Sequence, residues 1–136
     1  MKPTLTEFNL ICDAVGRLYG ESVAPQMVHA DLDKACAYMY DARINGKLLI
    51  VGDFAVLFSV GTMWYSSTIM VFEELVIRFR KEFRNPVSDV VPLLDAVRKK
   101  YGASAIITGD AQRGLMAPVY LSAGFVPAGT QFYKGE

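Results

Sequence analysis

The residue types that could do chemistry gather in the last third of the chain, between Glu73 and Tyr120. Two adjacent carboxylates, Glu73 and Glu74, interrupt an otherwise apolar run over residues 69–79. Successive side chains of a strand face opposite sides, and a break in that alternation is typical of a β-bulge. We therefore predict a bulge at Glu73-Glu74. Without a chemical role, one glutamate would face solvent and the other would pair with a neighbouring cation.

A strongly basic turn follows this strand. It places Arg78, Arg80, Lys81 and Arg84 around a single acidic residue, Glu82. Cations at this density can bind phosphate groups through their side chains. They can equally form a solvated edge that discourages aggregation through an exposed strand. The sequence leaves both interpretations open.

The elements that must position these residues can be read from apolar periodicity. Residues 69–79 predict a strand, residues 90–101 an amphipathic helix, and residues 105–108 a second strand. Strand, helix and strand in this order favour two parallel strands joined by a right-handed crossover. A short helix over residues 115–123 and a last strand running to Tyr133 complete this part.

The first half of the chain predicts two helices and a hairpin. Thr4 and Glu7 fit a capping box at the start of a helix that ends near Tyr19, and Asp31 can cap a second helix. Two apolar strands, residues 47–51 and 54–60, then flank Gly52-Asp53, a pair suited to a tight turn. Their continuous apolar character predicts that both faces are covered and that the hairpin is central. The whole order indicates an α+β fold with a mixed sheet.

Composition limits the class of protein. A chain of 136 residues is expected to form a single domain over residues 1–136. Equal numbers of basic and acidic residues, 14 each, do not support bulk attraction to nucleic acid. The apolar fraction of 52% suggests surface covered by a second copy or another protein subunit. We predict buried free thiols for Cys12 and Cys36, no metal site, no membrane span, and a cytoplasmic protein.

The sequence Tyr120-x-x-x-Gly124-Phe125, after this order of elements, resembles the end of the GNAT family, the acyl-CoA-dependent N-acyltransferases. The resemblance implies a GNAT-like mixed sheet, an antiparallel meander plus a parallel strand pair, flanked by helices. The first family strand is expected to be missing, because the first predicted element is a helix.

The resemblance also implies a chemistry, the transfer of an acetyl group from acetyl-CoA to an amine. Tyr120 matches the tyrosine that protonates the leaving thiolate, and Glu73 or Glu74 occupies the place of the general base. Backbone amides near the bulge, those of Val76 and Ile77 among them, would stabilise the oxyanion. An ordinary core role for Tyr120, with a buried ring and a wet hydroxyl, remains the alternative.

The phosphate-binding loop departs from the family pattern. The family has Gln/Arg-x-x-Gly-x-Gly/Ala before the helix, where the glycines let backbone amides approach the pyrophosphate. Here the segment reads Arg84-Asn85-Pro86-Val87-Ser88-Asp89, so the glycine positions hold Val87 and Asp89. The loop is degenerate, and side chains would have to replace it. The residues expected to bind the cofactor are Val76, Ile77, Arg78, Arg80, Lys81, Arg84 and Ser88.

Three functions are consistent with the sequence. The first is an acyl-CoA-dependent N-acyltransferase with an unusual phosphate loop. The second is a GNAT-like domain without catalysis that serves as a structural or protein-binding module, a pattern of compact bacteriophage proteins that can be part of the virion. The third is a sensor that binds a small ligand other than CoA between the splayed strands.

Overall fold

The computed structural model describes residues 1–20, 30–80, 85–109, 116–129 and 134. Helices and strands follow one another in the predicted order up to the fourth helix, with a short 3₁₀ turn, η1, before the third helix. The elements are α1 (Leu5–Gly20), α2 (Leu32–Ile44), β1 (Leu48–Val51), β2 (Phe54–Gly61), β3 (Met70–Arg78), η1 (Val87–Asp89), α3 (Val90–Lys100), β4 (Ala105–Ile107) and α4 (Ala117–Ser122).

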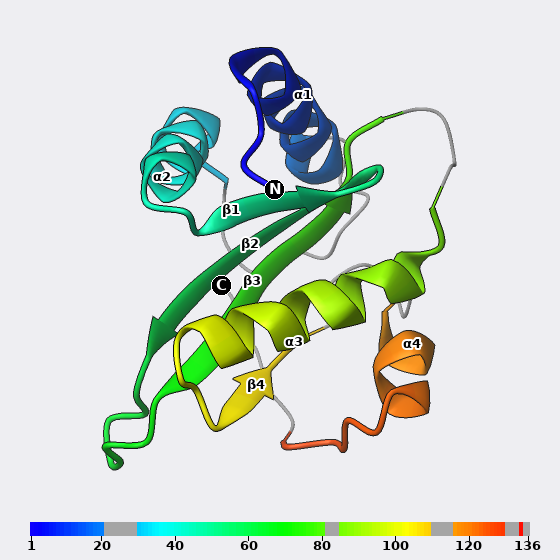
Figure 1. The fold of residues 1–136 in the computed structure, drawn as a ribbon. Helices are drawn as coiled ribbons and strands as arrows, with labels where there is room; N and C mark the ends of the chain where they lie inside the picture. Colours follow the sequence, from blue (N-terminus) through cyan, green and yellow to red (C-terminus); the bar gives the residue numbers. More distant parts are fainter. Residues whose placement is uncertain (21–29, 81–84, 110–115, 130–133, 135–136) are drawn as a thin grey trace.

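The strands form one mixed sheet in the order β1-β2-β3-β4. The pairs β1–β2 and β2–β3 are antiparallel, whereas β3–β4 is parallel. Helices α1 and α2 cover one face of the sheet, and α3 and α4 lie on the other (Figure 1). The predicted α+β class, with an antiparallel meander and a parallel pair, is therefore confirmed.

The sheet separates two apolar cores because side chains of its strands alternate between its faces. On the α1 and α2 side, Ile11 packs with strand residues such as Leu48 and Ile77. On the α3 side, Leu94 packs with residues such as Val56 and Val76. Coverage of both faces explains why the hairpin strands are continuously apolar.

Only one strand of the hairpin, β2, is central, however. In the described part of the sheet β1 lies at the edge, so that part of the prediction was wrong. On its side away from β2 it is contacted by Met1: the Ile50 amide donates to the Met1 carbonyl at 2.8 Å, and the Met1 amino group donates to the Ile50 carbonyl at 3.3 Å. Residues 1–4 form no strand, as expected.

Helix starts follow the predicted caps in the first half of the chain only. The Thr4 amide donates to Glu7 Oε1 at 2.9 Å, and the Glu7 amide donates to Thr4 Oγ1 at 3.1 Å. Asp31 accepts from the Lys34 amide at 3.1 Å. The predicted side-chain cap of the third helix by Ser88 or Asp89 is wrong for α3, because neither makes a capping hydrogen bond there.

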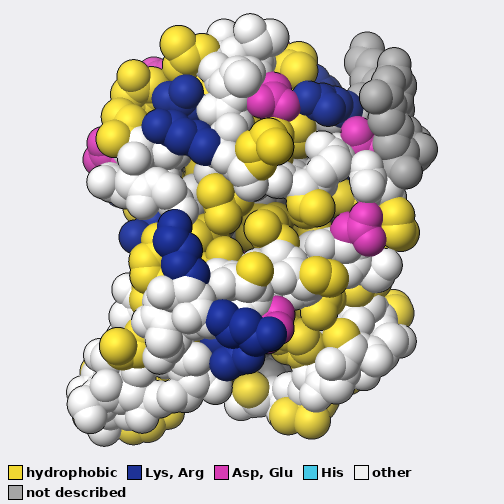
Figure 2. All heavy atoms as spheres, viewed as in Figure 1, with side chains coloured by type: hydrophobic (Ala, Val, Ile, Leu, Met, Phe, Trp, Pro, Cys, Tyr) yellow, Lys and Arg dark blue, Asp and Glu magenta, His cyan; other side chains and the backbone are white. Residues whose placement is uncertain are grey.

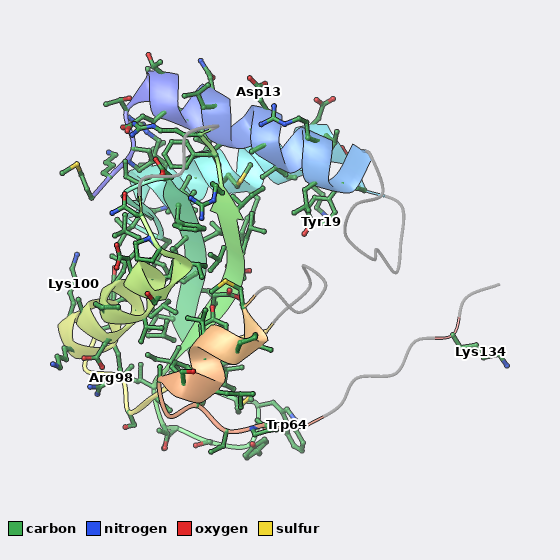
Figure 3. The ribbon with its side chains drawn as sticks, turned by 90° about the vertical axis from the view of Figure 1, so that its right-hand side faces the viewer. Asp13, Tyr19, Trp64, Arg98, Lys100 and Lys134 are labelled. Atoms are coloured by element: carbon green, nitrogen blue, oxygen red, sulfur yellow. The ribbon has the colours of Figure 1, made fainter. Side chains whose placement is uncertain are left out.

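One further segment differs from expectation. Residues 125–129 are not a strand, and the rest of the predicted last strand lies outside the described residues. The connection between β2 and β3 carries Trp64, which is 95% exposed and packs edge to face on Tyr65. Figure 3 places Trp64 at the end of the molecule opposite α1.

Among the described residues, no helix combines the length and the apolar character that a membrane span needs.

Candidate functional site

The sheet opens at the predicted bulge. Leu57 pairs with Leu75 but its neighbour Phe58 pairs with Glu73, so Glu74 is the extra residue of β3. Strand β4 pairs with β3 only over Met70–Phe72 and ends just before the bulge. The parallel pair thus occupies only the first part of the predicted strand, residues 69–79. Beyond the bulge, the described part of β4 no longer accompanies β3.

The backbone of β3 beyond the bulge presents alternate amides to this opening. The Phe79 amide donates to the Asp53 carbonyl on the neighbouring strand at 3.0 Å. In an antiparallel pair this direction repeats every second residue, so the Ile77 amide also faces β2. The Val76 amide therefore points away from β2. Of the two amides predicted to stabilise an oxyanion, only that of Val76 is directed toward the opening.

Glu73 and Tyr120, two of the predicted catalytic residues, are in contact. The Tyr120 hydroxyl donates to Glu73 Oε1 at 3.2 Å, which joins α4 to the bulge. The Tyr120 ring is buried, and it lies 5.0 Å from the Phe125 ring between centroids. Tyr120 also lines a pocket of about 370 Å³. Its walls are mainly apolar and come from the end of β4, α4 and the segment after α4, including Ile107, Leu121 and Val126.

Glu74 faces the opposite side of the sheet. Its carboxylate accepts the Tyr38 hydroxyl of α2, at 2.7 Å to Oε1 and 2.9 Å to Oε2. This hydrogen bond, with smaller contributions from burial and from the charge of Glu74, raises the pKa of Tyr38 to about 12. Glu74 and Tyr38 line a second pocket of about 450 Å³ between α1, α2 and the sheet. The two pockets therefore lie on either side of the bulge: Tyr120 lines one, and both Tyr38 and Glu74 line the other.

The basic turn is organised by acidic partners from other elements. Arg78 Nη1 lies 3.6 Å from Asp53 Oδ2, and the Arg78 guanidinium lies 4.2 Å from the centre of the Phe54 ring. Arg80 Nη2 donates to Glu7 Oε2 at 2.6 Å. Both cations thus anchor the end of β3 to the hairpin turn and to α1. Lys81 and Arg84 lie outside the described residues.

The segment before α3, which the resemblance aligns with a phosphate loop, is tied to the hairpin turn. Asn85 Nδ2 donates to Asp89 Oδ2 at 3.1 Å. The Asn85 side chain also fills the space beside Gly52, where a Cβ would come within 2.1 Å of Asn85 Oδ1. Ser88 is exposed on η1. Pro86, at the start of η1, contributes no amide donor there.

Sequence reasoning missed Tyr38 and Asn85. Tyr38 has the spacing of an ordinary helix residue, and no sequence signal linked it to Glu74. Asn85 was visible only as a position between Arg84 and Pro86. The contacts of both depend on elements distant in sequence, so only the folded structure reveals them.

Comparison with known proteins adds the fold family. No protein-family model and no curated protein matches the sequence. Among solved structures, a predicted acetyltransferase from Clostridium acetobutylicum, described with acetyl-CoA, is similar with a TM-score of 0.66 and 17% identity, over 99% of this chain and 94% of its own. An acetyltransferase from Trypanosoma brucei has a TM-score of 0.59 and 16% identity, over 98% and 96%.

A third similar structure is an integron cassette protein from the mobile metagenome of Cole Harbour Salt Marsh, with a TM-score of 0.67 and 12% identity, over 99% of this chain and 88% of its own. At these identities the likeness shows the fold alone. The chain has the mixed α+β fold of the GNAT acetyltransferases.

Proposed function

We propose that the protein is an acyl-CoA-dependent N-acyltransferase that acts at the bulge of β3. The observation that carries this proposal is the opening of the sheet at Glu74, with a tyrosine and a glutamate in contact on each side. The fold supports it, because similar structures include acetyltransferases. The pocket of about 370 Å³ beside Tyr120 would take the thioester arm. The pocket of about 450 Å³ beside Glu74 would take the amine.

Two residues carry out the two proton transfers of the reaction: Glu74 at the amine and Tyr120 at the sulfur. Glu74 accepts the proton that the amine loses as its nitrogen bonds to the carbonyl carbon, and passes it to solvent. The Val76 amide donates to the carbonyl oxygen as negative charge develops there. Tyr120 donates its hydroxyl proton to the sulfur as the carbon–sulfur bond breaks, and is reprotonated from solvent. In the structure this proton is donated to Glu73, so the hydroxyl would have to turn from Glu73 to the sulfur once the thioester is bound.

The CoA phosphates would be bound by side chains here, whereas the family binds them through backbone amides of its glycine-containing loop. Among the cations that the structure describes in the basic turn, Arg78 and Arg80 are in ion pairs with Asp53 and Glu7. Lys81 and Arg84 would then carry most of the phosphate contacts, with Ser88 as a neutral donor. This division predicts a modest affinity for CoA that depends strongly on salt.

The first test is thermal unfolding with and without acetyl-CoA. A ligand at about 100 times its dissociation constant stabilises the folded state by about 2.7 kcal/mol, which raises Tm by several degrees. An acetyl-CoA shift that is abolished at high salt supports the proposed phosphate grip. No shift at millimolar acetyl-CoA and low salt would overturn the proposal.

The second test is Tyr120→Phe, which removes only the hydroxyl. Loss of the general acid should slow acetyl transfer by about 10²-fold or more, while the acetyl-CoA shift is retained. Transfer is followed by release of CoA thiol over a panel of primary amines. Tyr65→Phe is the matched control, because Tyr65 is exposed beside Trp64. Equal turnover in the two variants would exclude Tyr120 as the acid.

A second candidate function, a GNAT-fold module without catalysis, is favoured by the ion pairs of Arg78 and Arg80. Two of the cations proposed for phosphate binding hold the fold together instead. Such a module would act by binding a protein partner or a second copy of this chain. The thermal test distinguishes the two functions, because only the transferase needs acetyl-CoA.

A further inference from the structure

The pocket beside Glu74 has a defined chemistry of its own. One part of its wall is apolar, formed by Val15 of α1, Met39 of α2 and Leu57 of β2. Tyr19, at the end of α1, lines it as well, and Figure 3 shows its side chain on the side of α1 that faces the rest of the molecule. Its volume of about 450 Å³ lies in the lower half of the range for ligand sites, which is about 300–1,000 Å³. A small molecule fits this size better than a folded partner.

Charges of both signs line the same pocket. Lys34 and Tyr38 stand one turn apart on α2, so their side chains share a face of the helix. The Tyr38 hydroxyl donates a hydrogen bond to the Glu74 carboxylate. Asp31 is engaged as the helix cap. The Lys34 side chain forms no ion pair with any residue in the described ranges.

We propose that this pocket binds an apolar α-amino acid as the acyl acceptor. Its amino group pairs with Glu74, its carboxylate pairs with Lys34, and its side chain packs against Val15, Met39 and Leu57. A ligand with a positive and a negative group matches the two signs of charge on the wall. The acceptor role rests on the proposed transferase function, whereas binding of the amino acid does not.

Two simpler ligand classes fit less well. A diamine would bring a second cation close to Lys34, where the two like charges repel. A carboxylic acid without an amine would leave Glu74 without a cationic partner and would add a second negative charge beside it. An amino acid satisfies both charges and fills the apolar part of the pocket.

The test compares three ligands of nearly the same shape without acetyl-CoA present. L-Leucine carries both charges, 3-methylbutylamine lacks the carboxylate, and 4-methylpentanoate lacks the amine. Binding is measured by isothermal titration calorimetry on the full chain. We expect L-leucine to bind about tenfold or more tightly than either analogue. Equal affinity for L-leucine and 3-methylbutylamine would overturn the carboxylate contact with Lys34.

Two variants assign the charges to residues. Lys34→Met keeps the length of the side chain, and it should weaken L-leucine about tenfold without changing 3-methylbutylamine. Glu74→Gln should weaken both of these ligands. Lys100→Met is the matched control, because Lys100 is exposed on α3, on the other side of the sheet (Figure 3). If Lys34→Met and Lys100→Met have the same effect, the proposal fails.

The outcomes separate this proposal from the transferase function. If acetyl-CoA raises Tm but L-leucine does not bind, the amino-acid proposal is overturned while the transferase function stands. If L-leucine binds with the predicted response of the variants and acetyl-CoA does not, the amino-acid site is supported and the protein is a binding module. Acetylation of L-leucine, lost in Lys34→Met and retained in Lys100→Met, supports both.

Discussion

Asp53 illustrates how a single charged residue shapes this molecule. It sits in the hairpin turn with a side chain that is only 1% exposed, and it pairs with Arg78 at the end of β3. The Arg78 guanidinium also lies over the Phe54 ring, so it is packed as well as paired. Removing one partner of a buried ion pair leaves the other charge uncompensated, which costs more than the pair itself contributes.

We therefore expect Asp53→Ala to lower the free energy of unfolding by about 3 kcal/mol or more. The measurement is urea unfolding followed by circular dichroism. Asp95→Ala is the control, because Asp95 pairs with Arg98 and Lys99 at the surface of α3, where Figure 2 shows blue and magenta side chains together. Its effect should be much smaller, since exposed pairs contribute little. Similar losses in both variants would show that burial of Asp53 is unimportant.

The contacts of individual residues were the least predictable feature. Adjacent glutamates in an apolar strand were sufficient to predict the bulge. They could not reveal that Glu73 meets Tyr120 while Glu74 meets Tyr38. Likewise the sequence showed four cations in one turn but not that Arg80 reaches Glu7 across the sheet end. Such contacts join distant segments, and a local pattern carries no information about them.

Among the elements, the hairpin turn between β1 and β2 is coupled to the segment before α3. Gly52 has a φ of +55°, a conformation that other residues adopt at a cost. The Asn85 side chain packs directly on it and leaves no room for a Cβ. Asn85 in turn donates to Asp89 at the start of α3. The turn thereby sets the position of the segment before α3.

Gly52→Ala should destabilise the protein more than Gly46→Ala. Both glycines have a positive φ, 55° and 71°, so both substitutions strain the backbone, by about 1–2 kcal/mol. Only at Gly52 does the new methyl group collide with Asn85, which should add about 1–3 kcal/mol, because nothing lies within 4 Å at Gly46. Thermal unfolding of both variants measures the difference. Equal Tm values would mean that Asn85 moves away without cost.

The helices and strands themselves were predictable, because each depends mainly on residues that are close together in the sequence. The capping residues Thr4 and Asp31 marked two helix starts correctly. The start of α3 was harder, since the Asp89 side chain is held by Asn85 and makes no cap of its own. The strand pairs were predictable both across the short hairpin turn and across the helical crossover between β3 and β4. The position of β1 at the edge depends on how the strands pack together. Its apolar character alone therefore gave a wrong prediction of its place in the sheet.

At the scale of the whole molecule, one sheet serves two cores. Strand β2 contributes Leu57 to the α1 and α2 side and Val56 to the α3 side. Neither core can lose its packing without disturbing the strands that the other one shares. We therefore expect a single cooperative unfolding transition, as is usual for a domain of this size.

Leu94→Ala tests this coupling. Leu94 is fully buried on the α3 side, so its truncation should cost about 2–5 kcal/mol. The loss should be the same when unfolding is followed by labelling of Cys12, on the other side of the sheet. Cys12 and Cys36 are only partly buried, so the prediction of buried thiols was wrong. Partial burial, with the neighbouring Cys36 thiol, raises the pKa of Cys12 to about 12, which slows its labelling in the folded state.

The control is Leu121→Ala, which should change stability by less than about 0.5 kcal/mol because Leu121 is exposed on α4. Figure 2 shows this part of the surface with several hydrophobic side chains at the lower right. If Leu94→Ala shifted the dichroism curve but left Cys12 labelling unchanged, the two sides would unfold separately.

The position of Trp64 has a consequence for spectroscopy. It is the only tryptophan of the chain, and it is almost completely in water in the folded state. Its fluorescence should therefore change little when the protein unfolds, and tyrosine emission or dichroism would have to follow folding instead. For the same reason, a blue shift of the tryptophan emission under native conditions would report that another surface has covered the tip between β2 and β3. The native indole is thus a built-in reporter of association.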